Sequence, residues 1–338
     1  MTGLRSYDRD AWAAAFSAAA APYQNDAEDA EQNGDTASAR RNYLRAYGYY
    51  RLARYPTTNS DAKLAAYRQS QELLLRAARY LTIPIERVEI PFRGQTGEGD
   101  RVVAYLRVPD ADRRLPILIV SGGIDTFKED VPRDGVLGRG IATLALDIPG
   151  VGDAPLPGSP YAERMFDAVL DWIGRQPRFD AERVGYWGAS TGGYWAVKIA
   201  HTHRDRLACA VSHGGCVHHA FEPGWIEEAQ WGEYPFELAE TLAYAFGRNT
   251  FDEWVEYAPQ LSLLRQGILD QPCADILVVN GLHDSVFPIS DCYLLLEHGL
   301  PKSARIFDAS HMGYTPATEQ IIVDWIASRL QTQGGNPP

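Results

Sequence analysis

Val184–Gly193 reads VGYWGASTGG, and this stretch decides the fold. Its centre, Gly188–Gly192, matches the pattern G-x-S-x-G. A short strand is predicted over 184–187 and a helix over 191–203, so Ser190 occupies the strand–turn–helix setting that the pattern requires. The small residues let the turn close sharply and leave the hydroxyl exposed. We therefore predict a nucleophile at Ser190; the alternative is a tight turn with a capping serine.

Strands and helices alternate on both sides of this motif, which predicts a doubly wound, mostly parallel sheet of the α/β class. Apolar and polar residues alternate in two runs before it, 88–92 and 102–108. These runs predict a hairpin at an antiparallel edge of the sheet. The further predicted strands are 115–121, 141–146, 207–212, 276–280 and 304–307. The further predicted helices are 159–174, with Ser159 as cap, then 289–299, ending on glycine, and 315–330.

Four segments follow from these patterns. Residues 1–85 are predicted to form an N-terminal helical domain, in which Tyr43, Tyr47 and Tyr50 recur at helical spacing as packing residues. Residues 86–213 and 272–331 form the predicted catalytic domain. Residues 214–271 are too long for a bare loop and are predicted to be a helical cap insertion. Residues 332–338 are predicted to be a disordered tail.

Composition excludes several classes of function. The net charge of −12 repels phosphate backbones, so nucleic acid is not an expected partner. No run approaches the roughly 20 apolar residues of a membrane span. The alanine-rich run 11–21 could pass for a signal-peptide core, but Asp8 and Asp10 favour an amphipathic helix. Four cysteines without a CxxC pair predict reduced thiols, a cytoplasmic location and no zinc site.

A serine hydroxyl needs a base to take its proton. His311 follows the last predicted strand, which is the position of the base in the chain order Ser…Asp…His. Asp284 follows the strand 276–280 and is predicted to orient that base. Asp291, inside the next helix, and Asp275, before the strand, are expected to point elsewhere.

Other histidines have weaker assignments. His201 and His203, on the helix after Ser190, are expected to be solvated. His298 is expected at a helix end. His218 and His219 lie in the predicted cap, where they either contact substrate or are surface residues.

An oxyanion requires preorganised N–H donors. One is predicted to be the Thr191 amide, directly after the nucleophile. The other is expected from Ser121-Gly122-Gly123-Ile124-Asp125, where paired glycines allow close approach: the Ile124 amide is the first choice and Gly123 the alternative.

The remaining candidates are substrate contacts and loops. Gly123 and Asp125 in the loop 121–125, Trp225 in the cap and Glu222 at the cap entry are candidate substrate contacts; a solvated glutamate is the alternative for Glu222. Residues 128–130 are predicted to start a helix. Asp147–Gly152 is predicted to be a tight loop, and it does not match a phosphate-binding loop.

With these residues placed, the chain resembles a branch of the α/β-hydrolases. The branch includes 2,6-dihydroxypseudooxynicotine hydrolase, the fungal pigment hydrolases that shorten polyketides, and the fermentation-respiration switch protein. The resemblance rests on Gly34–Ala37, Tyr49–Pro56, Ile85–Phe92, Ser121–Asp125 with Lys128-Glu129, Asp147–Gly152, Ser190, Asp284 and His311. It implies the α/β-hydrolase fold and a homodimer with a helical domain over the active site. It also implies hydrolysis of a carbon–carbon bond next to a ketone in some members and of esters in others.

Three functions therefore compete. The first is a cofactor-free serine hydrolase that cleaves a β-diketone or aryl ketone, such as a polyketide. The second is an ester or thioester hydrolase, or an acyltransferase. The third is a regulatory binding protein on a hydrolase scaffold, because fold alone does not fix function.

Overall fold

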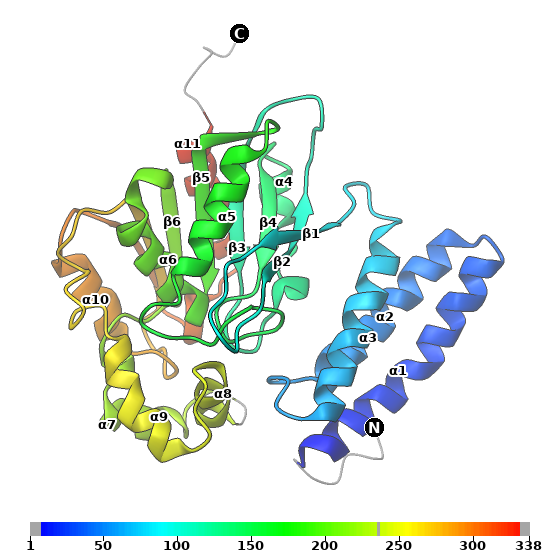
Figure 1. Ribbon diagram of the computed structural model, residues 1–338, viewed down its shortest axis with the longest axis horizontal. Coiled ribbons are helices and arrows are strands. Elements are labelled where there is room, and N and C mark those ends of the chain that lie inside the picture. The colour runs from blue at the N-terminus through cyan, green and yellow to red at the C-terminus, as the bar shows by residue number, and fades with distance from the viewer. Residues whose placement is uncertain (1–7, 235–236, 332–338) are drawn as a thin grey trace. The chain divides into compact units, whose positions relative to one another are not determined.

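The computed structural model describes residues 8–234 and 237–331 (Figure 1), so the predicted tail 332–338 lies outside the described residues. The chain divides into two compact units, Met1–Glu86 and Arg87–Pro338. The first contains three helices, α1 (Arg9–Gln32), α2 (Thr36–Ala53) and α3 (Asp61–Ala78). Each begins at a polar cap: Asp8, Asp35 and Ser60 accept a hydrogen bond from a backbone N–H of the first turn.

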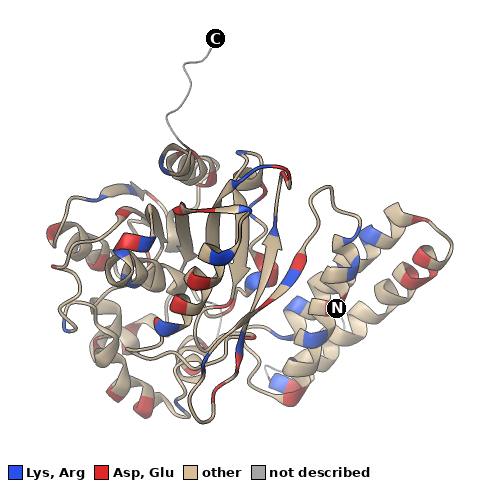
Figure 2. Ribbon diagram, turned by 45° about the horizontal axis from the view of Figure 1, so that its top comes forward, with Lys and Arg blue, Asp and Glu red and all other residues tan. Residues whose placement is uncertain are grey.

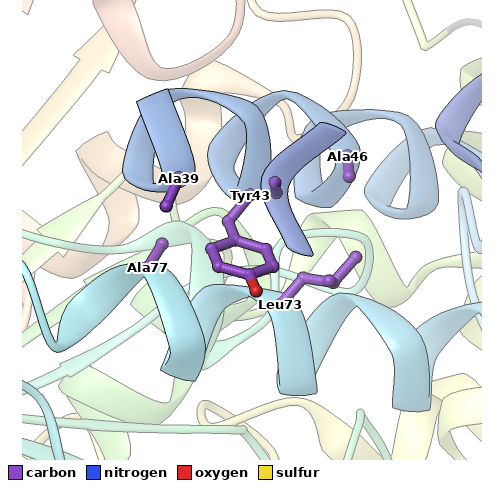
Figure 3. Packing of buried hydrophobic residues seen from close by; sticks show 6 residues of the cluster. Ala39, Tyr43, Ala46, Leu73 and Ala77 are labelled. Carbon is purple, nitrogen blue, oxygen red and sulfur yellow. The ribbon is translucent and has the colours of Figure 1, made fainter. Parts of the chain in front are cut away.

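A small hydrophobic core holds the three helices together. Figure 3 shows the Tyr43 ring of α2 directed toward α3, between alanines that let the helices approach closely. The buried members of this core are Ala27, Ala39, Tyr43, Ala46, Leu73 and Ala77, with Tyr47 and Tyr50 partly buried against them. The tyrosines of α2 therefore pack within this unit, as their helical spacing predicts.

Glu31, near the end of α1, is the centre of a polar cluster beside this core. Its carboxylate accepts hydrogen bonds from Arg76 at 2.6 Å, Tyr43 at 2.8 Å and Tyr80 at 2.8 Å. The hydrogen bond from Arg76 is the largest cause that lowers the pKa of Glu31, which falls to about 2. The ionised carboxylate thus joins α1 to α2 and α3.

Glu31→Gln is expected to lower the free energy of unfolding by about 2 kcal/mol at pH 7, because hydrogen bonds to charged groups contribute about 1.5–3 kcal/mol. Since the folded-state pKa is depressed, this stability is present above about pH 4.5 and declines as the pH falls toward 2. Denaturant unfolding of the full chain between pH 7 and pH 3 measures the difference. Glu72→Gln, exposed on α3, is the control; equal effects of both substitutions would contradict the assigned role.

The second unit is built on an eight-stranded sheet with the order β1-β2-β4-β3-β5-β6-β7-β8. Strand β2 pairs with β4 antiparallel, and β4, β3, β5, β6, β7 and β8 pair in parallel. The predicted fold, including its antiparallel edge, is therefore confirmed. The strands are β1 (Glu86–Pro91), β2 (Arg101–Arg107), β3 (Leu115–Ser121), β4 (Ala142–Leu146), β5 (Phe179–Ala189), β6 (Cys209–His213), β7 (Asp275–Gly281) and β8 (Ser303–Phe307).

Helices cover both faces of the sheet (Figure 1). Helices α5 (Arg164–Arg175) and α6 (Thr191–Thr202) lie in front of it in this view, and α4 (Asp134–Leu137) and α11 (Thr318–Leu330) lie behind it. Helix α10 (Ile289–Glu297) packs against β7. Strands β3, β4 and β6 are buried along their whole length, and their sequences are mostly apolar rather than alternating, with Thr143, Ser212 and His213 among the buried polar residues.

Three predicted helix boundaries were wrong. Helix α5 begins at Arg164 instead of Ser159, because 160–163 form turns with i to i+3 hydrogen bonds. Helix α11 begins at Thr318 instead of Thr315, because the Thr315 amide donates to the Thr318 side chain. Helix α10 ends at Glu297, before His298, so no glycine ends it.

Residues between β6 and β7 form a set of short helices. Their bounds are η3 (His219–Phe221), α7 (Pro223–Ala229), α8 (Leu238–Ala245), α9 (Phe251–Tyr257) and η4 (Ala258–Leu261). Several aromatic side chains of this segment are buried, among them Phe246, which stacks on Trp254 with ring centres 5.2 Å apart. Residues 214–271, between β6 and β7, are the cap.

Charged residues of both signs are spread over the helices and loops (Figure 2). The inner strands β3, β4 and β6 contain none. Within the described residues, no helix is both long and apolar enough to cross a membrane.

Candidate active site

The turn from β5 into α6 holds Ser190 in an uncommon backbone conformation. Its φ is 54° and its ψ is −125°, in a region that non-glycine residues rarely adopt. The Ser190 amide donates to the carbonyl of His213 at 2.8 Å, and the Gly193 amide donates to the Ser190 carbonyl at 2.7 Å. A Cβ at Gly188 would lie 1.9 Å from the Gly192 oxygen, so glycine is required there. The sharp turn therefore depends on the small residues that surround the serine.

Three side chains from separate loops meet at this turn. The Ser190 Oγ lies 2.9 Å from His311 Nε2, and His311 Nδ1 lies 2.8 Å from Asp284 Oδ2. His311 lies in η5 (His311–Gly313), after β8, and Asp284 lies in the loop after β7. The structure thus brings together the three residues predicted from chain order, at hydrogen-bonding distances.

Asp284 is held in place by donors of its own. Its side chain is fully buried, and its Oδ1 accepts the amides of Val286 at 2.8 Å and Phe287 at 2.9 Å. Its Oδ2 accepts the Asn280 Nδ2 at 2.9 Å in addition to the contact with His311. These donors, together with His311, fix the position of the Asp284 carboxylate in the loop after β7.

Asn280 is a residue of the site that the sequence analysis missed. Besides donating to Asp284, its Oδ1 accepts the amides of Gly281 at 2.8 Å and Met312 at 3.0 Å. One buried amide therefore connects the loop of Asp284 with the loop of His311. Its position at the end of β7 is the only sequence signal that could have suggested it.

The loop after β3 reaches the serine through glycine. A Cβ at Gly123 would lie 2.9 Å from the Ser190 Cβ and 3.2 Å from its Oγ, which places the Gly123 backbone against the nucleophile. Ile124 follows it and is buried. On the other side, Thr191 is the first residue of α6, so its amide has no acceptor within the helix. These are the two amides predicted to stabilise an oxyanion.

A buried ion cluster connects the segment after this loop with the loop that follows β4. Lys128, in η1 (Lys128–Asp130), places its Nζ 2.9 Å from Asp147 Oδ2, 2.9 Å from Glu129 Oε1 and 2.7 Å from Asp153 Oδ2. Burial opposes the charge, but the three carboxylates raise the pKa of Lys128 well above its ordinary value. Residues 128–130 form only a single short turn, and the loop predicted at Asp147–Gly152 is anchored to it by the Lys128 amide, which donates to Asp147.

The family model described as Esterase FrsA-like matches residues 2–331. The chain belongs to the FrsA-like esterase family. This membership confirms the predicted resemblance and agrees with the predicted class of enzyme, a hydrolase.

Individual relatives agree with this assignment. The chain is 30% identical over 263 residues to the alpha/beta hydrolase ucsC of Acremonium sp, covering 70% of this chain and 53% of that protein. It is 28% identical over 295 residues to Esterase FrsA of Vibrio vulnificus, covering 83% of this chain and 68% of that protein. The chain thus spans about half to two thirds of the length of these relatives.

A solved structure shares the fold. The 2,6-dihydroxy-pseudo-oxynicotine hydrolase superposes with a TM-score of 0.79 at 24% identity, covering 95% of this chain and 89% of that chain. Together with the sheet order, this likeness places the FrsA-like chain in the α/β-hydrolase fold.

In this FrsA-like chain the cap contacts the loops of the site. The Trp225 Nε1 donates to the Val286 carbonyl at 3.0 Å, so its polar edge is used in anchoring the cap. Glu222 pairs with Arg265 at 2.7 Å and lies 3.7 Å from His218 Nδ1. Neither side chain has a hydrogen bond to Ser190, His311 or Asp284 within the described residues. Asp125 is half-buried and accepts the Thr126 hydroxyl at 3.1 Å.

Asp291 anchors the entry to the cap. As expected, it points away from His311: its fully buried carboxylate accepts the amides of residues 217, 218, 219 and 220, as well as His219 Nδ1 at 3.0 Å. This fixes the turn by which the chain leaves the sheet.

Two histidines were predicted wrongly. His201, in α6, and His203, directly after it, are buried rather than solvated, although Thr202 between them is exposed. His201 Nδ1 bonds to the Val197 carbonyl, and His203 Nε2 lies 2.9 Å from Asp167. His213, which no pattern marked, is also buried, and its Nε2 lies 2.8 Å from the Met312 carbonyl. Among the described residues, no group of three or more His, Cys, Asp or Glu side chains could hold a metal ion.

Glu233, in the cap, contacts the backbone of the three-residue cluster directly. Its carboxylate accepts the His311 amide, with its oxygens at 3.0 and 3.1 Å, and the Ser285 amide at 3.0 Å. Ser285 directly follows Asp284, so one carboxylate holds the backbones on both sides of the His311–Asp284 contact. Sequence spacing contains no signal for this link, because it joins residues 78 positions apart.

Glu233→Ala is expected to reduce kcat/KM on the order of tenfold, because small misplacements of reacting groups slow catalysis strongly. The matched control is Glu240→Ala, an exposed acid in the same cap. Steady-state kinetics of both variants on one chromogenic ester measures the effect. If Glu240→Ala reduces activity as much as Glu233→Ala, the loss reflects cap charge in general and not the link to His311.

Proposed function

We propose that this FrsA-like chain is a cofactor-independent serine hydrolase that works through an acyl-enzyme on Ser190. The observation that carries the proposal is the hydrogen-bonded series from Ser190 Oγ to His311 and from His311 to Asp284. In this arrangement His311 is the base, and Asp284 fixes its tautomer and stabilises the imidazolium. The reading as a non-catalytic binding protein does not explain why all three groups meet in this order.

The first half of the reaction forms the acyl-enzyme. Ser190 Oγ attacks the substrate carbonyl carbon while His311 Nε2 accepts the hydroxyl proton. The amides of Ile124 and Thr191 donate to the resulting oxyanion, an interaction worth about 3–4 kcal/mol per donor. When the tetrahedral intermediate collapses, the bond to the leaving group breaks, and His311 returns the proton to it. Water then attacks the acyl-enzyme by the same route and releases the acid.

For the bond that is broken, we propose a carbon–carbon bond next to a ketone, in a β-diketone or polyketide-like aryl ketone. The leaving carbanion is then stabilised by the substrate as an enol or phenol and is protonated by His311. A second candidate, hydrolysis of a carboxylic ester or thioester, is favoured by the description of the family as esterases. The three-residue cluster serves either bond, because both reactions begin with the same attack on a carbonyl.

The experiment that separates the two candidates is a substrate panel. Aryl β-diketones and matched aryl esters are incubated with the chain, and the acid products are identified by mass spectrometry. Cleavage of the diketones at a higher kcat/KM supports the carbon–carbon candidate, and cleavage of the esters alone supports the second. Ser190→Ala must abolish both reactions, since a residual reaction would not pass through the proposed acyl-enzyme.

Several accompanying features are also proposed. The proposed substrate contacts are Gly123, Asp125, Glu222 and Trp225. Gly123 is among them because its backbone lies against Ser190. The four cysteines are free thiols, which suits a reducing compartment such as the cytoplasm. A homodimer is proposed from the family resemblance, and light scattering of the purified chain tests it directly.

A further inference from the structure

Arg133 carries a positive charge that no acid neutralises by contact. Its Cζ lies 3.9 Å from the centre of the Trp187 ring, and its Nε is buried without a hydrogen-bond partner. Within residues 8–234 and 237–331, the guanidinium forms no ion pair or hydrogen bond; Glu319 and Tyr314 act on it only electrostatically, without such a contact. A guanidinium that is partly withdrawn from water costs free energy unless it is paired. This chain has a net charge of −12, so an arginine without an acid partner needs an explanation.

The backbone of Arg133 is also unusual. Its φ is 48° and its ψ is 47°, the left-handed region that disfavours residues with a side chain. Four non-glycine residues in the described part of the chain have a positive φ, and two of the others are Ser190 and Met312, next to His311. Such conformations gather at functional sites.

The neighbours of Arg133 connect it with the loops of the candidate active site. Trp187 lies three residues before Ser190, and its ring centre is 6.1 Å from that of His213, whose carbonyl accepts the Ser190 amide. The His213 ring is in turn 5.2 Å from Tyr314, three residues after His311. Burial, together with the charge of Arg133, lowers the pKa of His213 to about 3. The positive charge of the guanidinium therefore influences the His213 ring.

We propose that Arg133 binds a carboxylate of the substrate, so that the chain acts on acyl compounds that also carry an acid group. This inference rests on the proposed function and names its substrate class. A guanidinium over an indole ring keeps the N–H groups at its edge free to bind a planar carboxylate with two parallel hydrogen bonds. Because the net charge of the chain repels anions, the local cation and not the overall field must select this substrate.

Two chromogenic esters test the proposal: the 4-nitrophenyl half-ester of glutaric acid, which carries a carboxylate, and neutral 4-nitrophenyl butyrate. The quantity measured is the ratio of their kcat/KM values. Arg133→Gln is expected to lower the ratio of half-ester to butyrate at least about 30-fold. Arg133→Lys is expected to lower it less, because lysine keeps the charge but lacks the paired N–H donors of the guanidinium. The control is Arg139→Gln, an exposed arginine that pairs with Asp324 and should leave the ratio unchanged. An unchanged ratio in Arg133→Gln would overturn the proposal.

A second experiment uses the wild-type chain alone, so its result does not depend on the folding of any variant. Glutarate and its neutral diamide are compared for the ability to slow the labelling of Ser190 by a fluorophosphonate. Protection by glutarate at a concentration at least about tenfold lower than the diamide supports a carboxylate site, and equal protection overturns it. Absence of any label on Ser190 would instead reject the proposed function, so the two failures are distinguishable.

Discussion

Ser190→Ala is expected to lower kcat by at least about 10⁴-fold, which is the usual order of effect when the nucleophile of a triad is removed. The alanine leaves no oxygen to attack the carbonyl, while the neighbouring amides and the His311–Asp284 contact persist. The backbone at φ 54° would still have to be adopted, so the fold must be checked by thermal unfolding. Turnover is measured on the best substrate of the ester and diketone panel.

The control for this substitution is Ser328→Ala, on the exposed surface of α11. It should change kcat by less than about twofold, since surface substitutions away from a site have small effects. Wild-type turnover by a well-folded Ser190→Ala variant would show that the reaction does not pass through this serine.

Asp284→Asn is expected to lower kcat by about 10³–10⁴-fold with little change in fold. Val286, Phe287 and Asn280 all donate hydrogen bonds to the position that residue 284 occupies. If the asparagine oxygen accepts the two backbone amides, its NH₂ group must face His311 Nδ1 and also Asn280 Nδ2, which then loses its acceptor. His311 Nδ1 then becomes an acceptor, and the proton moves to Nε2, where it prevents His311 from accepting the proton of Ser190.

Asp291→Asn is the matched control, because Asp291 is an equally buried carboxylate that also accepts backbone amides. Its partners belong to the cap entry, so the substitution should lower the melting temperature while kcat falls by less than about tenfold. Circular dichroism melts and steady-state kinetics of both variants separate the two roles. A larger loss of kcat in Asp291→Asn than in Asp284→Asn would show that the wrong acid has been assigned to His311.

Local patterns were sufficient to predict the sheet and the members of the three-residue cluster. The turn at Ser190 has a sequence signature, and chain order in an alternating fold leaves few positions for His311 and Asp284. The buried strand β3 is apolar over nearly its whole length, which is typical of a strand in a parallel sheet. These predictions rest on contacts between residues near in sequence or on the order of elements along the chain.

Contacts between distant residues could not be predicted in this way. Asn280 joins Met312 across 32 positions, and Glu233 joins His311 across 78. His203 lies directly after α6 and is buried in contact with Asp167, 36 positions earlier, which the spacing of residues along the helix does not reveal. Arg133 likewise stands in a stretch without any recognisable motif, and only its position over Trp187 draws attention to it.

The central claim is that His311 activates Ser190 for attack on a carbonyl, and the most direct test is the intact mass of the full chain after exposure to a fluorophosphonate. The proposal predicts a single adduct on the wild-type chain and none on Ser190→Ala, with labelling strongly slowed in His311→Ala. Absence of an adduct on the folded wild-type chain, or an adduct that persists in Ser190→Ala, would contradict it.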